Sequence, residues 1–174
     1  NKLVSLLIAE EKDPSRKVEL ENLLDASLHL EKLNEKIAVQ KTIVHNDYNP
    51  RNIAVRKNGA LAVYDWELAV LDYPHRDIVE FLSFALTEDY AEEELMRYLD
   101  FHYQLNRPEN PSRSDWYLTY EYAIIEFIIT RAVFYEVAGI VVKYEFSRRI
   151  LDNALKMLRI LRSNDQQLPQ MNQR

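Results

Sequence analysis

The stretch that decides the fold of this chain is residues 41–68, which read KTIVHNDYNPRNIAVRKNGALAVYDWEL. It opens with a short apolar run, Thr42-Ile43-Val44, which predicts a buried strand. A polar segment from His45 to Asn52 follows this strand, and a second polar cluster, Asp65-Trp66-Glu67, closes the stretch. Each polar cluster begins where an apolar run ends, so a small β element is expected to carry both of them.

A predicted β-hairpin connects the two clusters. The apolar runs Ile53-Ala54-Val55 and Leu61-Ala62-Val63-Tyr64 are separated by Lys57-Asn58-Gly59. Asn-Gly between apolar runs is the strongest local signal for a hairpin. The hairpin should fold Asp65 back beside the polar segment that precedes it.

Outside this stretch the apolar residues recur at helical spacing. Residues 1–10 are expected to be helical or extended, and Ser15 is the predicted N-cap of a long helix. Gly139 is predicted to end one helix before the next begins. The predicted helices cover about 16–36, 77–87, 89–105, 113–138 and 142–163, with a loop at 106–114 and a frayed tail at 164–174.

These elements predict a single α+β domain over residues 1–174, weighted strongly to α, in which helices surround a small β element. Its parts are an N-terminal helical region (1–40), the polar loop and hairpin (41–76) and C-terminal helices (77–163).

Composition excludes several classes of protein. Hydrophobic residues make up 47% and charged residues 29%, as in soluble globular domains, and the net charge of −6 argues against a nucleic-acid partner. The chain has no cysteine, which excludes disulfides and thiolate metal sites and suits a reducing, cytoplasmic location. Its apolar runs are too short to span a bilayer. Two glycines cannot build a glycine-rich phosphate loop, and the first residue is Asn1 rather than Met, so we expect a piece of a longer protein.

Three residues of the stretch have the types that phosphoryl transfer requires. The reaction needs a carboxylate near the acceptor proton and oxygen ligands for Mg²⁺. Asp47 is the candidate for the first, and Asn52, five positions later, is a candidate metal ligand. Asp65, at the end of the hairpin, is the second candidate ligand, because Mg²⁺ takes a few protein oxygens and completes its shell with phosphates and water.

The pattern His45-x-Asp47-x-x-x-x-Asn52, followed by a hairpin and Asp65-Trp66-Glu67, resembles the catalytic and metal-binding pair of protein-kinase-like enzymes. Its details are similar to the aminoglycoside phosphotransferase and choline kinase superfamily. Pro74 and Asp77, ahead of an apolar helix, resemble the downstream element of that superfamily. The resemblance covers about residues 41–86 and implies the C-terminal lobe of a kinase-like fold, without the N-terminal lobe.

The resemblance also implies supporting roles around the loop. His45 is expected to pack behind the loop, and Asp77 to cap the following helix and brace the loop. Glu67 is expected either to orient the metal site or to contact substrate. Arg51 is either a phosphate-facing cation or an exposed arginine, while Asn49 departs from the basic residue or histidine that relatives often carry.

The leading hypothesis is an ATP- and Mg²⁺-dependent kinase that phosphorylates a hydroxyl of a small, cationic acceptor such as an aminoglycoside, choline or ethanolamine. This piece by itself is expected to be inactive. The alternative is a kinase-like binding or regulatory module of a larger protein, and a phosphohydrolase built on His45, Asp47 and Asp65 is the third reading.

The remaining aromatic, acidic and histidine residues have weaker signals. In the superfamily the acceptor lies against the C-terminal helices, where Glu121 or Glu126 could hold an amine and aromatic residues could cage a cation. Core packing at helical spacing is the favoured reading for most of these aromatics. Their positions are Trp116, Tyr117, Tyr120, Tyr122, Phe127, Phe134, Tyr135 and Tyr144, and the histidines without a metal-ligand pattern are His29, His75 and His102.

Overall fold

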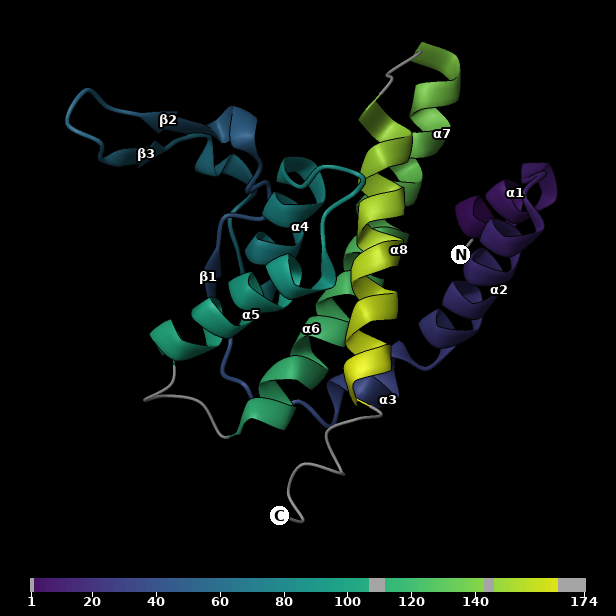
Figure 1. The fold of residues 1–174 in the computed structure, drawn as a ribbon, viewed down its shortest axis with the longest axis horizontal. Helices are drawn as coiled ribbons and strands as arrows, with labels where there is room; N and C mark the ends of the chain where they lie inside the picture. Colours follow the sequence, from purple (N-terminus) through teal and green to yellow (C-terminus); the bar gives the residue numbers. More distant parts are fainter. Residues whose placement is uncertain (1, 107–111, 143–145, 166–174) are drawn as a thin grey trace.

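The computed structural model describes residues 2–106, 112–142 and 146–165. Over these residues the chain is mostly helical and carries two small antiparallel sheets of two strands each (Figure 1). The helices are α1 Lys2–Glu10, α2 Pro14–Leu28, α3 Leu30–Asn34, α4 His75–Ala85, α5 Glu92–Asn106, α6 Arg113–Phe127, α7 Val133–Val142 and α8 Phe146–Asp165. The strands are β1 Thr42–Val44, β2 Ile53–Val55, β3 Leu61–Val63 and β4 Val70–Asp72.

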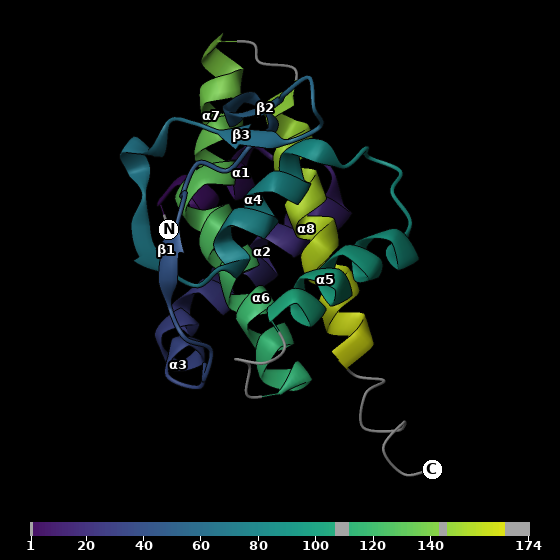
Figure 2. The same cartoon turned by 90° about the vertical axis from the view of Figure 1, so that its left-hand side faces the viewer.

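Helix α4 lies on the side of the helical body that faces the viewer in Figure 2, and it packs against both α6 and α8. The core around these helices is apolar and includes the fully buried side chains of Trp116, Tyr120 and Phe127. Asn153 of α8 is also buried, and its amide donates hydrogen bonds to the carbonyls of Ser83 and Leu86 at 3.1 and 2.9 Å. These bonds satisfy carbonyls at the end of α4 and fix its position against α8.

The N-terminal helices differ from the predicted single helix. The cap is Asp13 rather than Ser15, because the Asp13 carboxylate accepts the Ser15 N–H at 2.9 Å and Pro14 suits the first helical position. The helix ends at Leu28, and His29 has a non-helical backbone before α3 begins. Residues 2–10 are helical, which decides between the two conformations expected for this segment.

Arg16 anchors these N-terminal helices to the body of the molecule. Its buried guanidinium pairs with Glu136 of α7 at 2.6 Å and with Asp152 of α8 at 2.8 Å, as well as with Glu11. Every charge in this group therefore has a close partner.

The predicted hairpin is present. Ile53 pairs with Val63 and Val55 with Leu61, and Gly59 has a φ of 82°, which the turn requires. The hairpin projects from the helical body, on the side opposite α1 and α2, so helices do not surround it as predicted (Figure 1).

A second ribbon was not predicted. Strand β1 pairs with β4, with Ile43 opposite Leu71, and the two strands flank the polar stretch from both ends. Only Val44 of β1 is buried, so the expectation of a buried strand was wrong for Thr42 and Ile43.

The C-terminal helices also correct the predicted boundaries. A π-helical turn, Ile128–Ala132 (η4), joins α6 to α7, and Gly139 lies inside α7 instead of ending a helix. Helix α6 begins after an N-cap at Ser112, while most of the predicted loop (107–111) and the predicted tail beyond residue 165 lie outside the described residues. Within the described ranges, no helix combines the length and the apolar character needed to cross a membrane.

Candidate functional site

The loop 45–52 connects β1 to β2, and the first turn of α4 holds its backbone in place. The Asp77 carboxylate accepts the backbone N–H groups of His45 and Asn46 at 2.7 and 2.9 Å. Asn46 adopts a left-handed backbone conformation with a φ of 60°. Asp77 does not cap the helix as predicted, because α4 begins at His75 with Pro74 at the cap position, and the Asp77 side chain turns to the loop instead.

His45 connects the same loop to the end of the hairpin. Its ring is fully buried, and Nε2 donates a hydrogen bond to the carbonyl of Tyr64 at 2.8 Å. The ring lies 4.7 Å from that of Trp66, measured between centroids. Since Tyr64 directly precedes Asp65, this contact holds the second polar cluster against the first.

Asp47 is oriented by two neighbouring amides. Its Oδ2 accepts the Asn52 amide at 2.7 Å, and its Oδ1 accepts the Asn49 amide at 3.1 Å. The Asp47 side chain remains 24% exposed, so the carboxylate is oriented by the loop and still open to solvent. Asn49 is fully buried and also accepts the Arg51 N–H at 3.1 Å, which shows that its amide organises the loop.

The hairpin register brings the backbones around Asn52 and Asp65 together. Tyr64 donates its N–H to the carbonyl of Asn52 at 3.1 Å, so Asp65 follows the residue that pairs with Asn52. Asp65 is exposed and has a left-handed backbone, with φ 66° and ψ 55°. Because the Asn52 amide nitrogen faces Asp47, its amide oxygen is directed away from that carboxylate.

The oxygen donors of Asn52 and Asp65 fit Mg²⁺, which prefers a few carboxylate or amide oxygens together with phosphate and water. In the part of the chain that the structure describes, no group of three or more His, Cys, Asp or Glu side chains is arranged to hold a metal ion.

Charged residues that the sequence analysis missed surround the loop from the helices. Arg131, on the π-helical turn, lies 3.4 Å from Asp47 and donates to the carbonyl of Asn46. Arg76 of α4 donates to the Asn46 side chain and forms an ion pair with Glu126 of α6. The only sequence signal for these residues is their charge within apolar helical segments, and that signal does not say which element they face.

The buried carboxylates near the loop have altered acidity. Burial raises the pKa of Glu80 to about 7, against the opposing effect of the Arg131 cation. Burial also raises the pKa of Glu126, again opposed by a neighbouring cation, Arg76. Carboxylates whose pKa is raised by burial beside a cation are common at functional sites.

The family model for the phosphotransferase enzyme family matches residues 2–114 of this chain. The chain belongs to the phosphotransferase enzyme family. The matched segment includes the loop 45–52, the hairpin, Asp65 and Asp77. No curated protein gives a significant match.

In this member of the family, aromatic side chains lie beside the loop and the end of α4. Tyr48 lies 5.6 Å from Phe81, and the Arg51 guanidinium lies 5.6 Å from the centroid of Phe84. Tyr135 of α7 packs against Phe84 at 5.9 Å. Arg51 is exposed, and its Nε donates to Oδ1 of Asn49 at 3.2 Å, which fixes the guanidinium beside the loop.

Other aromatics of the C-terminal helices have the structural role that was favoured for them. Trp116, Tyr117, Tyr120 and Phe127 are buried in the core. Phe134 is 56% exposed. Tyr122 and Tyr135 are partly buried against the core, and Tyr144 lies outside the described residues.

The two acidic residues suggested as amine holders already have partners. Glu126 pairs with Arg76, and Glu121 pairs with Arg162 at 2.8 Å. Glu67 is exposed on a 3₁₀ turn, Trp66–Leu68.

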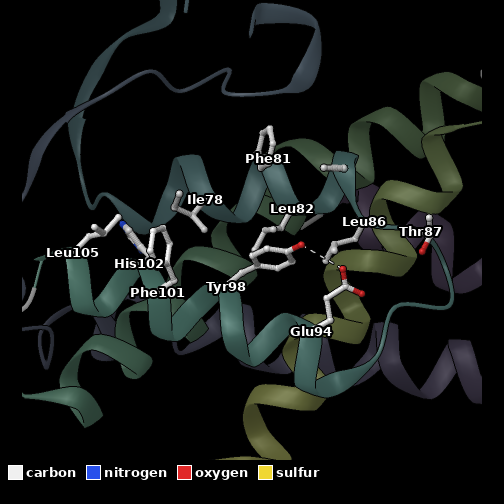
Figure 3. A pocket seen from close by; sticks show the side chains of 11 residues that line it. Ile78, Phe81, Leu82, Leu86, Thr87, Glu94, Tyr98, Phe101, His102 and Leu105 are labelled. Atoms are coloured by element: carbon white, nitrogen blue, oxygen red, sulfur yellow. Dashed lines mark hydrogen bonds between the residues drawn. The ribbon is translucent and has the colours of Figure 1, made fainter. Parts of the chain in front are cut away.

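A pocket of about 370 Å³ lies on another flank of α4, between α4 and α5 (Figure 3). Apolar side chains such as Ile78, Leu82 and Phe101 make up most of its wall, and the Tyr98 hydroxyl donates to Glu94 within it at 3.4 Å. Phe81 connects the pocket to Tyr48 of the loop, but none of the candidate site residues lines it.

Among the residues that the structure describes, the histidines take part in no group arranged to hold a metal ion. His29 is exposed between α2 and α3, and its Nδ1 donates to the carbonyl of Asp25 at 3.1 Å. His75 and His102 pack together with Trp116 and Tyr120, a group that we call the histidine cluster.

Proposed function

We propose that this chain is the catalytic lobe of a small-molecule kinase, which transfers the γ-phosphate of ATP to a hydroxyl group of its acceptor. The observation that supports this most directly is the organisation of the loop 45–52. Asp77 holds the loop backbone, and the amides of Asn49 and Asn52 orient the partly exposed carboxylate of Asp47. A preorganised carboxylate of this kind is what acceptor activation in phosphoryl transfer requires.

In the proposed reaction, Asp47 accepts the hydroxyl proton of the acceptor while the hydroxyl oxygen attacks the γ-phosphorus. The bond between the γ-phosphorus and the β,γ-bridging oxygen breaks, and ADP leaves. Asn52 and Asp65 would hold Mg²⁺, which neutralises charge on the transferring phosphate. Arg51, exposed beside Phe84, would supply a further cation at the phosphates.

The proposed supporting residues act by position. His45 and Asp77 hold the two ends of the site together through the bonds to Tyr64 and to the loop backbone. Glu67, exposed after Asp65, would orient the bound metal through water. The acceptor is proposed to be a small cationic amino alcohol or an aminoglycoside, and the protein to work in the cytoplasm, where a chain without cysteine is suited to reducing conditions.

The partner that completes the site is proposed to be a nucleotide-binding lobe of the same protein. Apolar side chains on the strands beside the loop are strongly exposed: Ile43 and Val55 at 72%, Leu71 at 64% and Leu61 at 61%. Exposed apolar side chains of this kind are typical of interaction surfaces. They lie on the two strand pairs that flank the loop, which is where a lobe covering the phosphates would need to dock.

The test is phosphate transfer by the full-length protein with Mg²⁺-ATP and a panel of amino-alcohol, aminoglycoside and sugar acceptors. Asp47→Asn should lower turnover by roughly 10²–10⁴-fold, the usual contribution of a general base, while nucleotide affinity measured by calorimetry is unchanged. Asp25→Asn, on the exposed face of α2, is the matched control and should have no effect.

Near-normal turnover of the Asp47 variant would contradict the assignment of the base. If the protein binds nucleotide but neither transfers phosphate to any acceptor nor hydrolyses ATP, the binding-module alternative is favoured. The 174-residue chain by itself should be folded and inactive, so Asp47-dependent turnover from it would show that a second lobe is unnecessary.

A further inference from the structure

Arg131 contacts the loop 45–52 from a distant part of the chain. Its Nη1 lies 3.4 Å from Oδ1 of Asp47 and 3.4 Å from Oε1 of Glu80, and its Nη2 donates to the carbonyl of Asn46. The guanidinium thus joins the backbone and side chain of the loop to a carboxylate of α4.

The backbone at Arg131 is unusual as well. The turn Ile128–Ala132 is π-helical, between the α-helical segments α6 and α7. A π turn inserts an extra residue and changes which side chains face a neighbouring element, and such turns recur at functional sites. Arg131 lies beyond the segment matched by the family model, which ends at residue 114.

Glu80 is an incompletely satisfied partner. Its side chain is fully buried, and its Oε2 has no hydrogen-bond partner among the described residues. The charged groups that act on it are Arg131 from the π turn, Asp47 from the loop, and Arg76 and Asp77 from its own helix, while Tyr135 of α7 lies close enough to be affected by it. Burial raises its pKa to about 7.

This arrangement is a poor way to gain stability. A buried ion pair offsets its desolvation only when geometry is close and the remaining oxygens are satisfied. Arg16 meets that condition, with carboxylates at 2.6 and 2.8 Å, whereas the contacts of Arg131 with both carboxylates are 3.4 Å long. Ion pairs of this length contribute little to stability, so the position of Arg131 between Asp47 and Glu80 points to a role at the loop.

We propose that Arg131 and Glu80 are positioning residues for Asp47, an inference that rests on the proposed function. Arg131 fixes the orientation of the Asp47 carboxylate by bridging it to the Asn46 carbonyl. Glu80 competes for the same Nη1 from the other side, at an equal distance. Because Nη1 is shared between the two carboxylates, Arg131 orients Asp47 without pairing closely with it, and the Asp47 carboxylate stays available to the hydroxyl of the acceptor.

The first test compares Arg131→Met with Arg131→Lys in the full-length protein. Arg131→Met should lower kcat by roughly 10–100-fold with little change in the KM for nucleotide, because orientation of the base affects the chemical step. Arg131→Lys should recover part of the loss, since it keeps the charge but not the two-pronged geometry. Arg162→Met, on α8 and paired with Glu121 away from the loop, is the control and should keep wild-type kcat.

The second test uses Glu80→Gln, which keeps the shape of the side chain. Wild-type Glu80 is protonated below its pKa and competes for Arg131 only above it. The ratio of wild-type to variant kcat should therefore be near one at about pH 6 and rise to roughly 3–10 at about pH 8. If Glu80 had a purely structural role, the ratio of wild-type to variant kcat would be the same at every pH.

Asp47→Asn in the same assay separates the two proposals. If that variant is inactive while Arg131→Met keeps wild-type kcat and Glu80→Gln gives a constant ratio, the positioning role is wrong and the proposed function stands. If Asp47→Asn retains turnover, the proposed function itself fails. If Arg131→Met does not fold, the pH dependence of the Glu80→Gln ratio decides the matter alone.

Discussion

Two sides of helix α4 bury polar groups in different ways. Toward the loop, α4 presents the carboxylates of Asp77 and Glu80, which contact backbone N–H groups and a guanidinium. Toward α5 and α6, it presents His75, whose ring packs 3.9 Å from Trp116 and 4.4 Å from Tyr120 and whose nitrogens have no hydrogen-bond partner among the described residues.

The acidity of the two sides differs accordingly. In the histidine cluster, burial lowers the pKa of His75 well below its usual value and that of His102 to about 4, so both rings are neutral at physiological pH. Beside the loop, burial raises the pKa of Glu80 to about 7, so its charge changes near physiological pH. We infer that the histidine cluster serves stability and the loop side serves chemistry, because only the second side keeps charges that respond under working conditions.

Of the substitutions that test this difference between the two sides of α4, Asp77→Ala is expected to lower the free energy of unfolding the most. The variant leaves the N–H groups of His45 and Asn46 without their charged acceptor, and hydrogen bonds to charged groups contribute about 1.5–3 kcal/mol each. We expect the free energy of unfolding to fall by about 4 kcal/mol, measured by urea denaturation. Asp25→Ala, at an exposed position, is the control; a loss no greater than that of the control would mean that Asp77 does not brace the loop.

Acid should destabilise the histidine cluster. The folded pKa of His102 is about 4, against an ordinary value of 6.5, so the unfolded chain binds more protons between these values and stability falls as pH decreases through this window. His102 alone should lower the free energy of unfolding by about 3 kcal/mol when the pH has fallen to about 4. His102→Gln should remove this part of the pH dependence in unfolding curves, whereas His29→Gln, at an exposed histidine, should leave it intact. Equal acid sensitivity of the two variants would contradict the assignment.

Glu80 should have the opposite pH dependence. Its folded pKa of about 7 lies above the ordinary value of 4.5, so its contribution to stability is complete below 4.5 and is lost as pH rises through 7. The free energy of unfolding of the Glu80→Gln variant, relative to that of the wild type, should therefore rise by about 2 kcal/mol between about pH 5 and pH 8. Urea denaturation at several pH values measures this change, with Glu31→Gln on the exposed face of α3 as control. A difference that does not vary with pH would show that Glu80 does not titrate in this range.

The smallest effect is expected on the projecting hairpin. Val55 is 72% exposed and Val79 of α4 is fully buried, so the same substitution tests the two environments. Val55→Ala should change the free energy of unfolding by less than about 0.5 kcal/mol, as surface substitutions usually do. Val79→Ala should cost more than about 1 kcal/mol because it removes buried methyl groups. A large cost at Val55 in the chain by itself would mean that the hairpin surface is already covered.

Much of this architecture could be predicted from local sequence. The hairpin followed from Asn58-Gly59 between two apolar runs, because the turn conformation depends on the residues within it. The helical regions followed from apolar spacing, and the phosphotransferase family from the pattern of Asp47, Asn52 and Asp65.

Features that depend on contacts between distant elements could not be read in this way. Strand β4 was missed because its partner β1 lies beyond the whole loop and hairpin. The break at His29 and the continuation of α7 through Gly139 depend on packing against neighbouring helices, which overrides local propensity.

The candidate site also has features that local sequence predicts and features that depend on contacts between distant elements. The sequence by itself determined which oxygen-bearing side chains share one loop, since Asp47 and Asn52 are separated by only five positions. Only the tertiary structure decided that Asp77 binds the loop backbone rather than its own helix, and that Arg131, 84 residues from Asp47, lies against it. The physical reason is that a helical period identifies a buried face but not the element that covers it, so the partner of a buried charge is known only when the helices are packed.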